Sequence, residues 1–191
     1  SVELDSDAGR RSESWRRARP YRWPRPDELE ERLSGVLAVI YLVFNEGYTA
    51  TSGDTHVRRA LCSVAIDLGR HVAQLFPSEP EALGLLALMR LQDSRREARI
   101  AEDGALVLLE AQNRALWDQA AIEEGIALTK AALEQSRPAP GPYSLQAAIA
   151  AVHAEATSPE ETDWPQIAGL YGVLYERAPT AVVALNRAVA I

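Results

Sequence analysis

Apolar residues recur at steps of three and four along most of this chain, a spacing typical of amphipathic helices. Four acidic residues between 27 and 31 lie at the start of the first series, and they are favourable at the positive end of a helix dipole. We therefore expect a helix from Asp27 to the Asn45-Glu46 pair. Its apolar face comprises Leu29, Leu33, Val36, Leu37, Ile40, Tyr41 and Phe44.

The residues from 45 to 54, NEGYTATSGD, predict the end of this helix and the start of the next. Gly47 can adopt the left-handed conformation that satisfies the last carbonyl groups of a helix, and Asn45 can bond nearby backbone. Ser52 or Asp54 can then cap the helix that follows. We expect this segment to be a hinge between two helices.

Glu46 is the unusual residue of this segment. The negative end of a helix dipole disfavours a carboxylate at the C-terminus of a helix. Glu46 therefore needs a cationic partner, and we expect this partner to be Arg95 or Arg96 in the segment QDSRREAR.

The same periodicity predicts six further helices. The second begins near Asp54 and ends before Pro77. The third has Ser78 as its N-cap and Glu81 at the capping-box position, and its centre, ALGLLALM, is apolar nearly all round, so it should be buried. The others are expected at about 113–134, 143–156, 164–178 and 180–191.

Between the third and fourth helices, Asp103-Gly104 separates Ile100 from an apolar run that starts at Leu106. This pattern indicates a short β-hairpin near 99–109. The expected fold is all-α, an array of about seven antiparallel helices with tetratricopeptide-repeat-like hairpins, plus this one hairpin.

The repeat signal is clearest in the last two helices. Trp164, Ile167, Ala168 and Tyr171 have the spacing of the first helix of a tetratricopeptide repeat, and Ala181, Leu185 and Ala188 fit the second helix. The final pattern reaches Ile191 without a cap, glycine or proline. We expect the natural protein to continue beyond this residue.

Residues 1–26 have no apolar period and form a basic arm rich in proline and arginine, ahead of a helical domain at 27–191. The arm is either a connector whose aromatic residues pack on the domain or a nucleic-acid-binding arm. Residues 1–25 carry seven arginines and four acidic residues, whereas the remaining 166 residues have a net charge of -10. An acidic domain of this kind repels nucleic acid.

The composition also excludes several classes of protein. The single Cys62 excludes a disulfide framework within the chain and fits a cytoplasmic location. The three histidines have no metal-ligand spacing, so no metal or cofactor is expected. The longest apolar runs are far shorter than the roughly 20 residues of a membrane span.

Three groups of polar residues are candidates for chemistry. They are Asn45, Glu46 and Tyr48; Asp93, Arg95, Arg96 and Arg99; and His153 with Glu155. No local spacing links them, and the sequence contains neither an activated-nucleophile motif nor a glycine-rich phosphate loop. We therefore do not expect an enzyme.

Several segments, in order, resemble the C-terminal extension of a group of bacterial extracytoplasmic-function (ECF) sigma factors. They are RLSGVLAVIYLVFNEGYTAT, EALGLLALMRLQDSRREAR, LVLLEAQNRALWD, IEEGIAL, GPYSLQAAIAAVHAEA, TDWPQIAGLYGVL and PTAVVALNRAVAI. The resemblance covers about residues 16–191. The sigma regions that precede this extension in the family are missing from the chain, and residues 1–15 match nothing in it.

The resemblance implies a regulatory and interaction domain of an RNA polymerase sigma factor. The implied partners are core RNA polymerase and the sigma DNA-binding regions of the full-length protein, with a small YCII-related protein as another candidate. Direct promoter recognition by this chain and membrane association are not expected.

Candidate partner-binding or seam residues are Asn45, Glu46, Tyr48, Asp93, Arg95, Arg96, Tyr143, Gln146, His153, Trp164, Tyr171 and Asn186. Each can equally serve ordinary packing between helices. The alternative function is a small-molecule-sensing or catalytic all-α domain. Its pocket would lie between Glu46, the Arg95/Arg96 pair and Tyr143.

Overall fold

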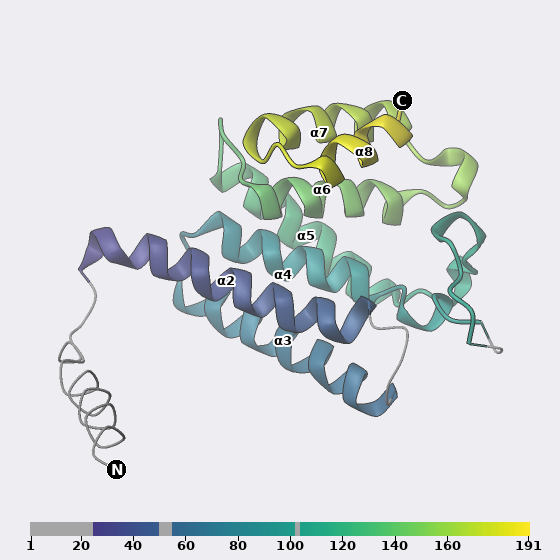
Figure 1. Ribbon diagram of the computed structural model, residues 1–191, viewed down its shortest axis with the longest axis horizontal. Coiled ribbons are helices and arrows are strands. Elements are labelled where there is room, and N and C mark those ends of the chain that lie inside the picture. Colours follow the sequence, from purple (N-terminus) through teal and green to yellow (C-terminus); the bar gives the residue numbers. More distant parts are fainter. Residues whose placement is uncertain (1–24, 50–54, 102–103) are drawn as a thin grey trace, which may run out of the picture. The chain divides into compact units, whose positions relative to one another are not determined.

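The computed structural model describes residues 25–49, 55–101 and 104–191. It confirms the all-α prediction, because these residues contain seven α-helices and no strand (Figure 1). The α-helices are α2 (Pro26–Thr49), α3 (Thr55–Leu75), α4 (Pro80–Asp93), α5 (Gln119–Gln135), α6 (Pro142–Glu155), α7 (Trp164–Arg177) and α8 (Ala181–Val189). Four short 3-10 turns connect them: η1 (Arg96–Ala98), η2 (Leu109–Ala111), η3 (Arg114–Leu116) and η4 (Pro159–Glu161).

The chain divides into two compact units, residues 1–34 and 35–191. Within the second unit, α4 packs against α3, α5 and α6, and α6 also packs against α7. The last helix, α8, lies beside α7 (Figure 1). Most of the predicted arm lies outside the described residues, as do Ser52 and Asp54.

The central helix of this unit is α4, as its sequence predicted. Eight of its fourteen residues are buried, on all sides of the helix. They are Ala82, Gly84, Leu85, Leu86, Ala87, Leu88, Met89 and Leu91. Because α4 packs against α3, α5 and α6, it can bury an apolar surface that extends around its whole circumference.

At Gly84, α4 and α6 approach each other closely. A Cβ atom at this position would lie 2.6 Å from the backbone nitrogen of Ser144 and 2.8 Å from its Cα. The absence of a side chain at Gly84 therefore allows the two helix backbones to come into direct contact.

Glu81 connects the start of α4 to the start of α6. Its carboxylate accepts hydrogen bonds from the backbone nitrogens of Tyr143 and Ser144, at 2.8 and 3.0 Å, and from the Ser144 hydroxyl at 2.7 Å. These donors belong to the first turn of α6, where backbone N–H groups lack partners within the helix. The predicted N-cap of α4 was wrong, since Glu79 holds that position without a side-chain hydrogen bond.

Glu124 on α5 joins three helices through ion pairs. It lies 3.2 Å from Nη2 of Arg70 on α3 and 2.6 Å from Nε of Arg90 on α4. From the sequence, the adjacent pair Glu123-Glu124 is expected to be solvated, whereas Glu124 forms ion pairs with two arginines. Its two partners are arginines from separate helices, so Glu124 fixes α5 relative to both.

The predicted end of the first helix was wrong. Helix α2 continues through Asn45 and Gly47 to Thr49, and the only described residue with a positive φ is Gly104. The guanidinium of Arg99 donates a hydrogen bond to the Tyr48 carbonyl and lies 3.8 Å from the centre of the Tyr48 ring. An arginine from the segment after α4 thus satisfies the end of α2, and no left-handed glycine is needed there.

The predicted pairing of Glu46 was also wrong. Glu46 is exposed on α2, and among the described residues it forms no ion pair with Arg95 or Arg96. Arg96 pairs with Asp93, and Arg95 lies over the Trp117 ring at 6.0 Å. Both arginines are engaged locally, and solvent hydrates the Glu46 carboxylate.

The segment between α4 and α5 is less regular than predicted. Instead of a hairpin of two strands, a single antiparallel bridge pairs Ile100 with Leu106. The predicted helix at 113–134 begins six residues later, where Asp118 caps α5 by accepting a hydrogen bond from the Ala121 nitrogen at 3.0 Å. The intervening residues form η2 and η3.

Candidate functional site

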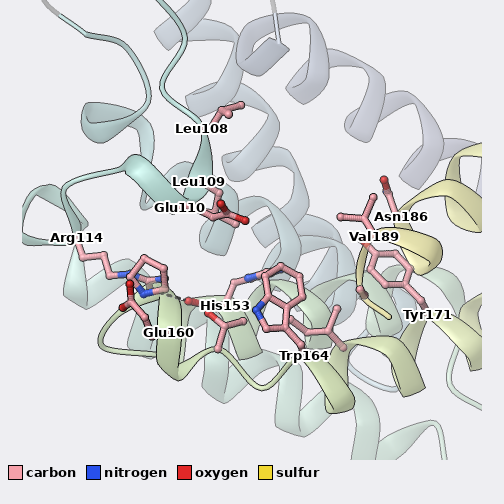
Figure 2. A pocket seen from close by; sticks show the side chains of 14 residues that line it. Leu108, Leu109, Glu110, Arg114, His153, Glu160, Trp164, Tyr171, Asn186 and Val189 are labelled. Atoms are coloured by element: carbon pink, nitrogen blue, oxygen red, sulfur yellow. Dashed lines mark hydrogen bonds between the residues drawn. The ribbon is translucent and has the colours of Figure 1, made fainter.

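A groove of about 550 Å³ opens between the 108–114 segment, the end of α6, and the helices α7 and α8 (Figure 2). We call it the Trp164 groove. Its lining combines aromatic, aliphatic and charged side chains from four separate parts of the chain. They are Leu108, Leu109, Glu110, Arg114, His153, Pro159, Glu160, Thr162, Trp164, Ile167, Tyr171, Asn186, Val189 and Ala190.

Trp164 and His153 form the centre of the groove. Their rings meet edge to face, with centroids 5.4 Å apart and an interplanar angle of 80°. Trp164 is the first residue of α7, whose start is fixed by Asp163 accepting a hydrogen bond from the Gln166 nitrogen, while Pro165 sits in the first turn. The capped start of α7 therefore positions the indole against α6.

His153 is neutral at physiological pH. Burial lowers its pKa from the ordinary 6.5 to about 4, and the nearby guanidinium groups of Arg95 and Arg114 lower the pKa in the same direction. The imidazole therefore contributes hydrogen-bonding capacity to the groove at neutral pH, but no charge.

Arg114 holds one wall of the groove in place. Its Nη1 donates hydrogen bonds to the carbonyls of His153 at 2.9 Å and Ala156 at 2.7 Å, which closes the C-terminal end of α6. Its guanidinium also stacks over Trp117, with the Cζ atom 4.5 Å from the ring centre. Burial, and then repulsion from Arg95, lower the pKa of Arg114.

Two exposed carboxylates lie at the mouth of the groove. In Figure 2, Glu160 lies beside Arg114, while Glu110 stands on the η2 wall between Arg114 and α8. A hydrogen bond from Ser158 lowers the pKa of Glu160, and Arg114 adds to this effect. Glu110 forms no ion pair with any residue that the structure describes.

The aliphatic rim is unusually exposed. Leu108 on one side is 73% exposed and Val189 on the other side is 72% exposed. Large apolar side chains that border a concave surface are characteristic of sites that bind proteins or other apolar partners. The rim therefore extends the apolar surface of the groove outward.

Four of the twelve predicted site residues meet in this groove, namely His153, Trp164, Tyr171 and Asn186. Tyr171 lies on α7 and Asn186 on α8, and burial raises the pKa of Tyr171.

The other eight residues lie elsewhere. Tyr48 stacks on Phe44, with centroids 5.4 Å apart, and Tyr143 packs edge to face against Tyr41 at 5.5 Å. Gln146 hydrogen-bonds to the Pro142 carbonyl of its own helix. Asn45, Glu46, Asp93, Arg95 and Arg96 do not line the groove. Glu46, Arg95, Arg96 and Tyr143, the residues of the alternative pocket, are also absent from its lining.

Sequence reasoning missed the wall formed by Leu108, Glu110 and Arg114. From the sequence, Leu108 and Glu110 were placed in or next to the predicted hairpin, and Arg114 in the predicted helix at 113–134. One available signal was Asn113, whose side chain accepts a hydrogen bond from the Ala115 nitrogen at 3.1 Å and starts η3. With Asp118 as a second cap five residues later, the sequence does encode an interrupted segment.

The residues that the structure describes contain no group of three or more histidine, cysteine or acidic residues arranged to bind a metal ion. None of their helices combines the length and the apolar character that crossing a membrane requires.

We predict that His153 makes the free energy of unfolding depend on pH. The unfolded chain takes up this proton near pH 6.5 and the folded chain near pH 4, so this contribution is complete above pH 6.5 and is lost as the pH falls towards 4. It should amount to about 2 kcal/mol, because solvent screening reduces the full value for a partly exposed ring. The contribution of His153 is measured by urea unfolding of the wild type and of His153→Gln, at pH 4 and at pH 6.5. Equal pH dependence in the two proteins would contradict the assignment.

The fold and the groove define an all-α protein with an open groove that has aromatic side chains at its centre. Residues 32–133, more than half of the chain, match the Family of unknown function (DUF6596), and the chain belongs to this family. It is also similar to "Uncharacterized protein R00370" of Rhizobium meliloti (strain 1021), with 50% identity over 172 residues. The match covers 90% of this chain but 40% of the relative. No solved structure matches the chain.

Proposed function

We propose that this chain is a non-catalytic, protein-binding regulatory domain of a larger bacterial transcription factor of the ECF sigma class, acting in the cytoplasm. The observation that carries the binding role is the Trp164 groove, where an aromatic centre is bordered by exposed Leu108 and Val189. A concave apolar surface with a few polar groups is the usual form of a site that anchors side chains of a partner.

The sigma-factor part of the proposal is supported by the seven ordered segments that resemble the C-terminal extension of ECF sigma factors. The length of the Rhizobium meliloti relative is consistent with it, because this chain spans only about 40% of that protein. A domain of this size can therefore be one part of a larger regulator. Its proposed partners are core RNA polymerase and the sigma DNA-binding regions, with a small YCII-related protein as a further candidate.

Acidity of the domain supports a protein partner over nucleic acid. Residues 26–191 carry a net charge of -10, and this charge repels phosphate backbones. Promoter DNA is therefore not expected to bind this domain directly.

The proposal is tested by deletion and by binding. Removing the segment equivalent to residues 30–191 from a full-length protein should abolish promoter-specific transcription in a reconstituted assay. The purified chain, immobilised, should retain either core RNA polymerase or separately expressed sigma regions. Intact transcription after the deletion would overturn the proposal, as would retention of neither partner.

A thermal-shift screen against metabolites distinguishes the alternative. A small molecule at 100 times its dissociation constant stabilises a protein by about 2.7 kcal/mol. A stabilising metabolite that is lost with Trp164→Ala, together with no retention of polymerase or sigma regions, would favour a sensing domain.

A further inference from the structure

We propose that the Trp164 groove binds a basic, amphipathic segment of a partner protein, with an apolar side chain over Trp164 and a lysine or arginine against Glu110 and Glu160. This inference rests on one part of the proposed function, namely that the groove binds a protein. It adds the chemistry that the partner must present.

The shape of the groove favours an anchored segment over a flat interface. Its volume of about 550 Å³ lies within the range of roughly 300–1,000 Å³ that is typical of ligand pockets. One wall is formed by η2 and the other by α8, and the floor comes from α6 and α7 (Figure 2). A channel bounded by separate elements suits the side chains along one face of a helix or an extended strand.

The apolar part of the site specifies the anchor. Trp164, Ile167 and Tyr171 line the groove, and Leu108 and Val189 extend this surface to the rim. Exposed aliphatic side chains on both sides can cover an inserted leucine, phenylalanine or tryptophan and exclude water around it.

The charges of the groove lining favour a basic residue beside the apolar anchor of the partner segment. At neutral pH the lining carries two carboxylates, Glu110 and Glu160, and one guanidinium, Arg114, whose Nη1 is occupied by two α6 carbonyls. His153 is uncharged, and Arg95 does not line the groove. The net charge of the lining is therefore negative, and the acidic body around it adds to the attraction of a cation.

A displayed random-peptide library, selected on the immobilised chain, provides the probe. Enriched peptides should combine lysine or arginine with a large apolar residue. The best of them, made as a fluorescein-labelled synthetic peptide, should bind at least tenfold more tightly than the same peptide with glutamate in place of its basic residues.

Two matched pairs of variants locate the binding. Leu108→Ser and Glu110→Lys should each weaken the basic peptide by roughly threefold to tenfold, the size expected for a rim contact or a charge pair. Leu75→Ser, on a 74% exposed leucine of α3, and Glu134→Lys, on an exposed α5 residue outside the groove, should change the affinity by less than about twofold. All four sites are exposed, so the variants should fold.

Enrichment of acidic peptides would overturn the proposal. It would also be overturned if the control variants lost as much peptide affinity as the groove variants. Peptide binding confined to the groove, without retention of polymerase or sigma regions, would uphold this inference and reject the sigma-factor function. If Leu108→Ser and Glu110→Lys both retain polymerase or sigma regions as strongly as the wild type, the sigma-factor function would be upheld and this inference about the groove would be rejected.

Discussion

Gly84→Ala should destabilise the protein by about 3 kcal/mol, although alanine is a better helix former than glycine. The new Cβ would lie 2.6 Å from the Ser144 nitrogen and 2.7 Å from the Ser144 hydroxyl oxygen. Two of the nearest atoms belong to the α6 backbone, so the contact can be relieved only by moving α4 and α6 apart. Separation of these helices would also weaken the hydrogen bonds from the start of α6 to Glu81.

A matched control is available on α7. Gly169→Ala makes the same change at an exposed helical position, where a Cβ would meet nothing within 4 Å. It should be neutral or stabilising by up to about 1 kcal/mol, through helix propensity and loss of chain entropy on unfolding. Thermal melts followed by circular dichroism should show a drop of roughly 10 °C for Gly84→Ala alone. Similar melting temperatures for the two variants would show that α4 and α6 do not meet as described.

Arg114→Ala should be nearly as damaging and should also alter the groove. The substitution removes two charge-assisted hydrogen bonds to α6 carbonyls and a cation–π contact with Trp117, together worth roughly 2 to 3 kcal/mol. It also removes a cation near His153, so the pKa of His153 should rise from about 4 towards its ordinary value. Denaturant unfolding measures the first effect, and NMR titration of the imidazole measures the second.

Two further variants, Arg114→Lys and Lys130→Ala, distinguish the loss of the hydrogen bonds and ring stacking of Arg114 from the loss of a positive charge. Lysine at 114 keeps the charge, but it lacks the planar fork that contacts two carbonyls while stacking on an indole, so its effect should be intermediate. Lys130 is exposed on α5 and outside the groove, so its loss should matter little. An unchanged His153 titration in Arg114→Ala would refute the proposed electrostatic link.

The regular part of this fold was predictable because helices carry their own periodicity. The continuous apolar surface of α4 indicated a helix with neighbours on all sides, and Asp163 with Pro165 placed the start of α7 within a residue. The failures occurred where a distant residue decides the local structure. Gly47 remains helical because Arg99, 52 positions later in the chain, satisfies the end of α2, and no local pattern near Gly47 reports this.

The candidate site was predictable in part for the same reason. His153, Trp164, Tyr171 and Asn186 were identified as polar or aromatic members of helices, and their helices bring them together. Glu110 and Arg114 belong to non-repetitive turns, whose positions depend on contacts with α6 and Trp117. Hydrophobic periodicity carries no information about such a wall.

The two walls of the groove differ in how they are held, and this difference has a mechanical consequence. The α8 wall is built on a regular helix, whereas the opposite wall is the single turn η2, followed by η3, whose Arg114 contacts the end of α6. Segments with few backbone hydrogen bonds open at much lower free energy than a central helix. We expect the η2 wall to move more easily than the central helix α4, so that the gap can adjust to anchors of different size without disturbing the core around α4.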